Sequence, residues 1–216
     1  FLAQHIETDA ALAYRQHEGP PTDSGDGDPA GADPHPEAGP TSPETDLVFF
    51  LADLDHFKQI NDQHGHSAGD AVLVQTAQRL REVFRDADYL VRWGGEEFLI
   101  VARATGREHA PELAERARAR VGGTPFELPD GSQAPCTCSV GFAAFPLSLQ
   151  HPRALNWSQV IDVADGALYT AKRAGRNQWC GALEATSASP QALRQGARGA
   201  FTQWAESGEL RLVRSV

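Results

Sequence analysis

The apolar positions of the chain follow two different periods, one typical of helices and one typical of strands. From Leu2 to Ala13 they recur every three or four residues, which predicts a helix over residues 1–16. Residues 47–54 are predicted to form a strand, and its apolar residues fall on both faces, which predicts a strand that is central in its sheet. Helical spacing returns over residues 67–86, so we expect a long helix with one buried face there.

The remaining pattern predicts an alternation of strands and helices. In chain order we expect a turn of helix at 57–62, a hairpin at 89–103, a helix at 108–121, a strand pair around Pro129-Asp130-Gly131 within 124–145, a helix capped by Asn156 that ends at Gly175, and a strand at 178–180. The order β-α-β-β-α-β-β-α-β is typical of the α+β class, with one mostly antiparallel central sheet flanked by helices. Residues 190–206 and 209–216 predict a further helix and strand.

The predicted hairpin carries the first candidate chemistry. Gly94 and Gly95 separate two apolar runs and both tolerate positive φ, so they predict a tight turn. Glu96 and Glu97 follow directly and would lie at its rigid tip. Paired carboxylates in such a place can bind Mg²⁺, which prefers oxygen ligands and phosphate co-ligands.

A second pair of carboxylates, Asp53 and Asp55, ends the central apolar strand. Because side chains alternate along a strand, these two should lie on the same side of it. Taken alone, each acidic stretch is as well explained as a solvated turn or a strand end. Together they predict that two adjacent strands bring carboxylates to one metal site.

Composition limits the class of protein. The 216 residues suffice for one domain with appendages, and no apolar run approaches the ~20 residues of a membrane span. Residues 17–46 hold seven prolines, five glycines and eight acidic side chains without Lys or Arg, which predicts a disordered insertion. We interpret it as a solvated spacer, with a regulatory tether as the alternative. It contributes −8 of the net charge of −10, and the acidic balance argues against a nucleic-acid-binding surface.

The three cysteines, Cys136, Cys138 and Cys180, are interpreted as small core residues. A metal site is the weaker alternative, because no second Cys or His pair has the spacing of metal ligands. Free thiols fit a reducing cytoplasm.

Four motifs, taken in order, resemble the GGDEF family, the diguanylate cyclases. They are Asp53-Leu54-Asp55-His56-Phe57-Lys58-Gln59-Ile60-Asn61-Asp62, Gly65-His66-Ser67-Ala68-Gly69-Asp70, Gly94-Gly95-Glu96-Glu97-Phe98, and Ala164-Asp165-Gly166-Ala167-Leu168-Tyr169 with Lys172-Arg173-Ala174-Gly175-Arg176-Asn177. The third letter of the central motif is Glu, a variant that active members also use. The resemblance covers roughly residues 46–180 and implies the family's palm-like, ferredoxin-like cyclase fold. We therefore expect a catalytic domain over 1–180, with the insertion at 17–46, and a C-terminal extension of unknown role over 181–216.

The resemblance implies condensation of two GTP into cyclic di-GMP and two pyrophosphates, with a ribose 3′-hydroxyl attacking an α-phosphate in each half. It implies two Mg²⁺ or Mn²⁺ ions per active site. It also implies a transient homodimer, because each domain offers one nucleotide pocket. The motif that the family places before its first helix is absent, so we expect a cytoplasmic fragment of a larger receptor, either free or membrane-bound.

The resemblance also implies roles for single residues. Glu96 would be the general base, or the ligand that lowers the pKa of the 3′-hydroxyl, and Lys58 would offset charge in the transition state. The expected metal ligands are Asp53, the Leu54 carbonyl, Glu96 and Glu97. The expected GTP-binding residues are Phe57, Asn61, Asp70, Lys172 and Arg176, with Asn61 and Asp70 on guanine and the two cations on the β- and γ-phosphates. Lys172 and Arg176, four residues apart, would share one helix face; favourable charge at a helix end is the alternative.

An Arg-x-x-Asp pattern, from Arg85 to Asp88, precedes the hairpin, with five residues between Asp88 and Gly94. At that spacing the family has a product-inhibition site, so the resemblance implies that Arg85, Asp88 and Arg116 bind cyclic di-GMP. The plainer interpretation of such a pattern is a surface helix end.

Two other functions compete with an active diguanylate cyclase. A non-catalytic or weakly active sensor of cyclic di-GMP or GTP would typically have a degenerate central motif, whereas the motif is intact here. A cyclase that acts on ATP is opposed by Asn61 and Asp70, which suit guanine.

Overall fold

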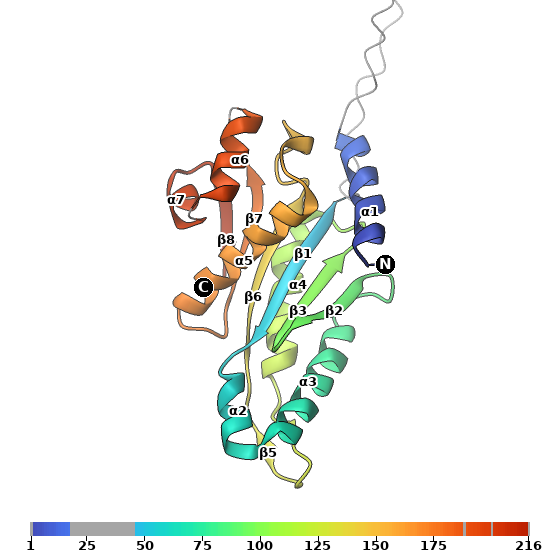
Figure 1. Cartoon of the computed structure of the whole chain (residues 1–216), viewed down its shortest axis with the longest axis vertical. Coiled ribbons are helices and arrows are strands. Elements are labelled where there is room, and N and C mark those ends of the chain that lie inside the picture. Colours follow the sequence, from blue (N-terminus) through green and yellow to red (C-terminus); the bar gives the residue numbers. More distant parts are fainter. Residues whose placement is uncertain (1, 18–45, 188, 200, 216) are drawn as a thin grey trace, which may run out of the picture.

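Six strands form one mixed sheet through the middle of the molecule (Figure 1). The structure is a computed structural model that describes residues 2–17, 46–187, 189–199 and 201–215. The strands lie in the order β2-β3-β1-β6-β7-β8. They are β1 (Leu47–Leu54), β2 (Tyr89–Gly94), β3 (Glu97–Ala102), β6 (Cys138–Phe145), β7 (Trp179–Ala185) and β8 (Leu210–Arg214). Within the described ranges, β6 and β7 form the one parallel pair of this sheet, so the predicted α+β class with a mostly antiparallel sheet is confirmed.

Helices cover both faces of the sheet. They are α1 (Leu2–His17), α2 (Phe57–His64), α3 (His66–Arg81), α4 (Ala110–Gly122), α5 (Trp157–Arg173), α6 (Pro190–Arg198) and α7 (Phe201–Glu206), with short 3₁₀ turns at Arg107–His109 and Pro152–Ala154. All eight residues of β1 are buried, as its apolar run predicts. Phe50 packs in the core with α2, α3 and α4, whereas Phe49 and Leu51 pack with α1, α5 and α6.

The candidate chemistry lies at one end of this sheet. Figure 1 shows that β1 ends next to the turn between β2 and β3, with α2 and α3 just beyond. The predicted capping box of α5 is present, because the Asn156 side chain accepts from Gln159 N and the Gln159 side chain accepts from Asn156 N. This cap fixes where α5 starts as it crosses the sheet toward the same end.

Residues 138–145 pair differently from the prediction. The Pro129 turn does join a short strand pair, β4 (Phe126–Glu127) and β5 (Gln133–Ala134). However, β6 leaves that pair and lies between β1 and β7, in register with β1 from Phe145 to Cys138. The predicted single pair over 124–145 is therefore wrong in its second half. Pairing with β1 and β7 is favoured because it buries all of the apolar strand β6.

The C-terminal extension continues the same sheet. Because β7 spans Trp179–Ala185, the expected boundary at residue 180 falls inside a strand. β8 pairs with β7 in antiparallel register, and Leu193 of α6 and Trp204 of α7 are buried on the α5 side. The described residues of 181–216 thus add an edge strand and two helices to the domain.

The cysteines are free and buried, as expected for core residues. Burial raises the pKa of the Cys180 thiol to about 11 and that of Cys136 to about 12, so both are protonated at neutral pH. In the part of the chain that the structure describes, no helix has the length and apolar character needed to cross a membrane.

The expected disordered insertion lies outside the described residues, except for its ends at His17 and Asp46. His17 Nε2 lies 2.8 Å from Asp46 Oδ1, and Arg107 Nε donates to Asp46 Oδ2 at 2.6 Å. Burial alone would raise the pKa of Asp46, but hydrogen bonds from His17 and Arg107 lower it below its ordinary value. The two ends are therefore held together by a contact that does not involve residues 18–45.

Deletion of residues 20–43 should change the melting temperature by less than about 2 °C, because the contact between His17 and Asp46 already closes the loop. Thermal unfolding followed by circular dichroism measures this. In the full chain, Asp46→Asn should instead lower the melting temperature by about 5 °C at pH 7, since the partly buried Arg107 guanidinium loses its carboxylate partner.

The loss caused by Asp46→Asn should shrink as the pH falls through the lowered pKa of Asp46, because the parent then loses the same charge. A large drop in melting temperature on deletion would instead mean that the removed segment packs against the domain.

Candidate active site

The register between β1 and β3 places two of the expected metal ligands opposite each other. Asp53 and Glu97 are Cα partners at the end of the ladder. Partners in register project to the same face of a sheet, and Lys172 of α5 marks that face, with its Nζ 2.8 Å from Asp53 Oδ2. The structure thus brings the two carboxylates together; their role as metal ligands stays a prediction.

The hairpin turn lies one residue away from its predicted position. Gly94 ends β2, and the turn consists of Gly95 and Glu96, with φ of 49° at Gly95. A shift in pairing between Arg92 and Gly94 moves the turn, and Arg92 Nε donates to Gly95 O at 2.9 Å. The prediction of a turn at Gly94 and Gly95 is therefore corrected. Leu54 N donates to Glu96 O at 3.4 Å, which joins the turn to the end of β1.

The opposed carboxylates share a partly buried and negative environment. Burial raises the pKa of Asp53; the hydrogen bond from Lys172 opposes this rise, and the charge of Glu96 adds to it. Burial also raises the pKa of Glu97, and the charge of Asp53 raises it further. Carboxylates shifted in this direction beside a single ammonium group form a site that attracts additional positive charge.

The oxygen atoms at this end of the sheet fit a hard divalent cation such as Mg²⁺. Asp53 and Glu97 supply carboxylates, while Leu54 and Glu96 lie next to them in the chain. Among the residues described, no three Asp, Glu, His or Cys side chains are already grouped as a ligand set. The Lys172 ammonium group lies beside the Asp53 carboxylate, so a bound cation and this ammonium group would compete for the same carboxylate.

Asp55 supports the end of β1 rather than the chemistry. Its Oδ1 accepts from Ser139 Oγ at 2.7 Å, and its Oδ2 accepts from Thr137 Oγ1 at 2.7 Å and from Asn177 N at 2.9 Å. These bonds connect β1 with β6 and with the loop after α5. Ser139 and Thr137 were not predicted, because their contact with Asp55 depends on the pairing of β6.

α2 and α3 position the residues assigned to guanine. Phe57 begins α2 and is buried, Asn61 lies one turn later, and Asp70 is exposed in the first part of α3. Gly69 permits the close packing of the two helices, because a Cβ atom there would lie 2.0 Å from Asn61 Oδ1. The Asn61 side chain thus lies against the backbone of α3, next to Asp70. Lys58 is exposed in the first turn of α2.

Lys172 and Arg176 do not share a helix face, so this prediction is wrong. α5 ends at Arg173, and Arg176 has left-handed backbone geometry with φ of 65°. Gly175, with φ of 128°, already turns the chain away from the helix axis. Lys172 contacts Asp53, whereas Arg176 lines a separate pocket next to β8.

The residues of the Arg-x-x-Asp pattern lie at the other end of the hairpin. Arg85, Asp88 and Arg116 line one pocket with a volume of about 530 Å³. Asp88 Oδ2 accepts from Arg85 N, and its Oδ1 accepts from Arg103 N, each at 2.9 Å. The carboxylate therefore holds the turn together and fixes it to the end of β3. His109 lines the same pocket and was not predicted, because it belongs to no motif.

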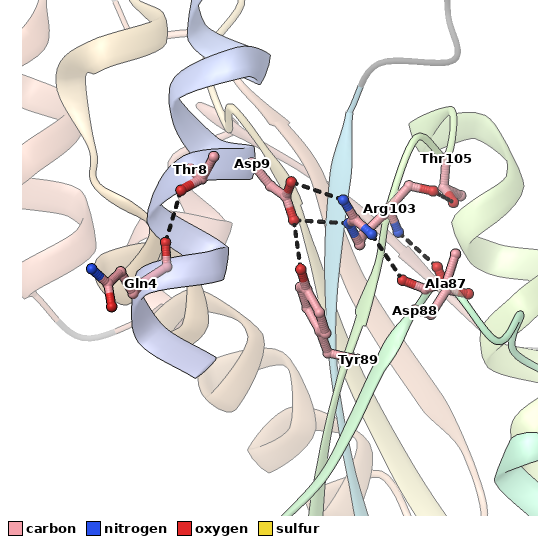
Figure 2. A network of polar contacts seen from close by, with 8 residues as sticks. All are labelled: Gln4, Thr8, Asp9, Ala87, Asp88, Tyr89, Arg103 and Thr105. Carbon is pink, nitrogen blue, oxygen red and sulfur yellow. Dashed lines mark hydrogen bonds and ion pairs between the residues drawn. The ribbon is translucent and has the colours of Figure 1, made fainter. Parts of the chain in front are cut away.

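Figure 2 shows that α1 contacts this same end of the hairpin. Asp9 of α1 forms an ion pair with Arg103, with Oδ2 and Nε 2.8 Å apart, and accepts from the Tyr89 hydroxyl at 3.1 Å. Arg103 Nη1 also donates to Ala87 O at 3.2 Å. Through Arg103, α1 is therefore connected to the turn that holds Asp88.

The sequence that builds this fold and site matches a known family. A family model described as "Diguanylate cyclase, GGDEF domain" matches residues 38–178. The chain belongs to the GGDEF family. This GGDEF chain is 44% identical over 133 residues to diguanylate cyclase DgcP of Pseudomonas aeruginosa, a match that covers 62% of this chain and 19% of that protein. It is 38% identical over 134 residues to diguanylate cyclase DosC of Escherichia coli K12, with 62% and 28% covered. The aligned region is less than a third of the length of either relative.

Solved structures give the same family assignment. The GGDEF domain of PA1120 (YfiN or TpbB) from Pseudomonas aeruginosa is 35% identical with a TM-score of 0.55, covering 61% of this chain and 79% of that one. The active GGEEF domain of a diguanylate cyclase from Vibrio cholerae is 36% identical with a TM-score of 0.53, covering 61% and 80%. The GGDEF domain of DgcB from Caulobacter crescentus, solved in complex with c-di-GMP, is 29% identical with a TM-score of 0.56, covering 61% and 73%.

Glu97→Gln should raise the melting temperature at pH 7 by about 2 °C, because the amide removes a partly buried charge that faces Asp53. A carboxyl group whose pKa is raised by folding destabilises the fold when it is ionised and stops doing so once protonated. The gain should therefore disappear as the pH falls below the raised pKa of Glu97. Thermal unfolding across the acidic range measures this, with Glu7→Gln on the exposed side of α1 as the matched control. A lower melting temperature for Glu97→Gln at pH 7 would contradict the electrostatic interpretation.

Proposed function

We propose that this GGDEF chain is the catalytic domain of a diguanylate cyclase, which condenses two GTP into cyclic di-GMP and two pyrophosphates. The observation that carries the proposal is the pair of carboxylates at Asp53 and Glu97, opposed in register beside Lys172 at the open end of the sheet. Nucleotidyl transfer needs a site where carboxylates can hold cations next to the attacking and leaving oxygens. The diguanylate cyclase relatives support the same reaction.

Asp53, the Leu54 carbonyl, Glu96 and Glu97 would hold Mg²⁺ or Mn²⁺, two ions per site. When bound, the ions lower the pKa of the attacking hydroxyl and stabilise charge on the attacking and leaving oxygens. Glu96 lies in the turn beyond Glu97, next to the end of β1, and would accept the proton from the ribose 3′-hydroxyl. Burial raises the pKa of both Asp53 and Glu97, and a bound cation would oppose this rise by favouring the ionised carboxylates.

Guanine would bind between α2 and α3. Asn61 can donate and accept hydrogen bonds, and Asp70 can accept from the N1 and N2 hydrogens of guanine. Phe57 contributes an aromatic ring beside this place, because its side chain and that of Asn61 both come close to Gly69. This set favours GTP over ATP, since adenine lacks the two donors that face Asp70.

The phosphates would contact cations from two elements. Lys172 is already beside Asp53 and would move toward the β- and γ-phosphates once a metal ion shares that carboxylate. Lys58, exposed at the start of α2, would offset charge in the transition state. Arg176 contributes from the loop after α5, and not from the face of α5 that carries Lys172.

Catalysis would require two copies of the domain. One chain provides one set of Asp53, Glu97 and the α2–α3 residues, and therefore binds one GTP. The second nucleotide must come from another copy, face to face with the first, so we propose a transient homodimer.

We also propose a cytoplasmic location, because a GTP substrate and three free thiols fit that compartment.

We also propose that Arg85, Asp88 and Arg116 bind cyclic di-GMP as a product-inhibition site. The two arginines that line the pocket can donate charge-assisted hydrogen bonds to phosphates. Asp88 accepts two backbone hydrogen bonds, and its remaining lone pairs can accept hydrogen bonds from a guanine edge. The hairpin places this pocket about five residues of strand, roughly 17 Å, from the carboxylates. Product bound there would act by holding domains apart or by stiffening the hairpin.

Glu96→Gln should reduce cyclic di-GMP formation at least about 100-fold while the melting temperature stays within about 2 °C. The amide is a poorer ligand for Mg²⁺ and cannot accept the proton. The assay incubates the purified protein with GTP and Mg²⁺ and quantifies cyclic di-GMP by chromatography, with Glu7→Gln as the control. Turnover within a few-fold of the parent would remove Glu96 from the mechanism. A parent that binds cyclic di-GMP but never forms it would favour the sensor over the enzyme.

Arg85→Ala should weaken cyclic di-GMP binding about tenfold or more, because the phosphate loses a charge-assisted contact. Initial turnover of GTP, before product accumulates, should stay within about threefold, since the carboxylates lie at the opposite end of the hairpin. Isothermal titration with cyclic di-GMP measures the affinity. Arg81→Ala, at the exposed end of α3, is the matched control. Equal affinities for the parent and Arg85→Ala would exclude this pocket as the inhibitory site.

A further inference from the structure

An arginine-lined pocket lies where the loop after α5 meets β7 and β8. Its volume is about 700 Å³, and its polar lining includes Glu115, Arg118, Arg176, Trp179, Arg214 and Ser215. Arg214 and Ser215 come from the C-terminal extension, which lies outside the family match over 38–178. The extension therefore adds side chains to a pocket that already contains an expected GTP-binding residue.

The end of β8 is held in place at this pocket. Trp179 N donates to Ser215 Oγ at 3.1 Å, and Ser215 N donates to Trp179 O at 3.0 Å. Cys180 is the register partner of Arg214. These contacts hold the backbone of Arg214 beside the first residues of β7, where Arg214 lines the pocket.

Hydrogen bonds also hold the Arg118 side chain, which lines the same pocket. Arg118 makes a two-point contact with the Glu115 carboxylate, and its Nη1 donates to Asn177 Oδ1 at 2.8 Å. Trp179 Nε1 donates to the same Glu115 carboxylate at 3.0 Å. The charge of Arg118 is therefore neutralised by Glu115.

Two cations in the pocket are not neutralised. The Arg176 and Arg214 side chains make no hydrogen bond or ion pair with the part of the chain that the structure describes, and both are exposed. With Arg118 and Glu115 cancelling, the named charged groups of the pocket sum to two positive charges, in a chain whose net charge is −10. Such a local reversal of sign favours an anion, and guanidinium groups match phosphate oxygens in geometry.

We infer that this pocket binds a phosphoryl anion of the pyrophosphate class, with Arg214 of the extension acting beside Arg176. The pocket adjoins the candidate active site through one residue, because Asn177 N donates to Asp55 Oδ2 at 2.9 Å while Asn177 Oδ1 accepts from Arg118. The anion has two possible sources, the terminal phosphates of a bound nucleotide or free pyrophosphate. The nucleotide source rests on the proposed function, whereas binding of free pyrophosphate does not.

Isothermal titration with pyrophosphate, without nucleotide or metal, tests the inference directly. Arg214→Gln should weaken the affinity about tenfold relative to the parent, because one charge-assisted contact is lost. Arg211→Gln is the matched control, since Arg211 is an exposed arginine of the same strand that does not line the pocket, and its affinity should stay within about twofold. Equal affinities for Arg214→Gln and Arg211→Gln would overturn the inference.

A second titration distinguishes the two sources of the anion. A GTP analogue with a methylene group between the α- and β-phosphates cannot release pyrophosphate. If Arg214→Gln weakens both this analogue and pyrophosphate, the pocket takes the terminal phosphates of the nucleotide. If it weakens pyrophosphate alone, the pocket takes the free anion. If it weakens neither, the inference fails, even where the parent forms cyclic di-GMP from GTP.

Arg214→Lys separates binding from folding. Lys keeps the positive charge but lacks the planar fork, so this variant should regain part of the lost affinity. Its melting temperature, with those of Arg214→Gln and Arg211→Gln, should lie within about 2 °C of the parent, because the Arg214 side chain is exposed and makes no hydrogen bond or ion pair with the described residues. Complete recovery of affinity would also support an electrostatic contact, whereas no recovery with an intact fold would contradict it.

Discussion

The register that sets Asp53 against Glu97 is the constraint on which the candidate active site depends. Like charges held at neighbouring positions in a partly buried place repel each other, which opposes folding at neutral pH. Packing must hold them there. Phe98 and Ile100 anchor β3 in the core under α3 and α4, so the strand cannot slide to separate the carboxylates without exposing that apolar face. Lys172 offsets part of the repulsion and leaves the site attractive to further cations.

The hairpin connects two regions that differ in charge. At the turn lie the carboxylates, and at its base lie Arg85 and Asp88, fixed through Arg103 to Asp9 of α1. The paired strands β2 and β3 join these ends, so the proposed binding of product at the base would have a physical route to the turn. At the opposite edge of the sheet, β8 extends the domain beyond the family match and brings Arg214 toward the loop after α5. The two proposed sites for phosphate-containing ligands would thus lie near opposite edges of one sheet.

Local sequence patterns predicted those parts of the molecule that depend on neighbours in the chain. The apolar run of β1, the Asn156 cap and the α+β order all follow from such patterns. Contacts between residues far apart in the sequence were not predicted by these local patterns. The partners of Asp55 come from β6 and from Asn177, and neither follows from spacing. The spacing of four residues predicted one helix face for Lys172 and Arg176, although Gly175, the predicted end of that helix, turns the chain before Arg176. The turn lies one residue after its predicted position because the pairing of β2 with β3 shifts between Arg92 and Gly94, and the two glycines alone do not reveal this shift.

The most direct test of this account is the titration of the Asp53 and Glu97 carboxyl carbons by NMR, in the parent and in Lys172→Gln. Burial raises the pKa of both groups above those of exposed Asp and Glu. The charge of Glu96 raises the pKa of Asp53 further, the charge of Asp53 raises the pKa of Glu97 further, and the ammonium group of Lys172 limits both rises. The account predicts that both carboxyl groups titrate above their ordinary values in the parent and higher still in Lys172→Gln. Ordinary values that do not move when Lys172 is replaced would mean that the two carboxylates do not form one electrostatic unit.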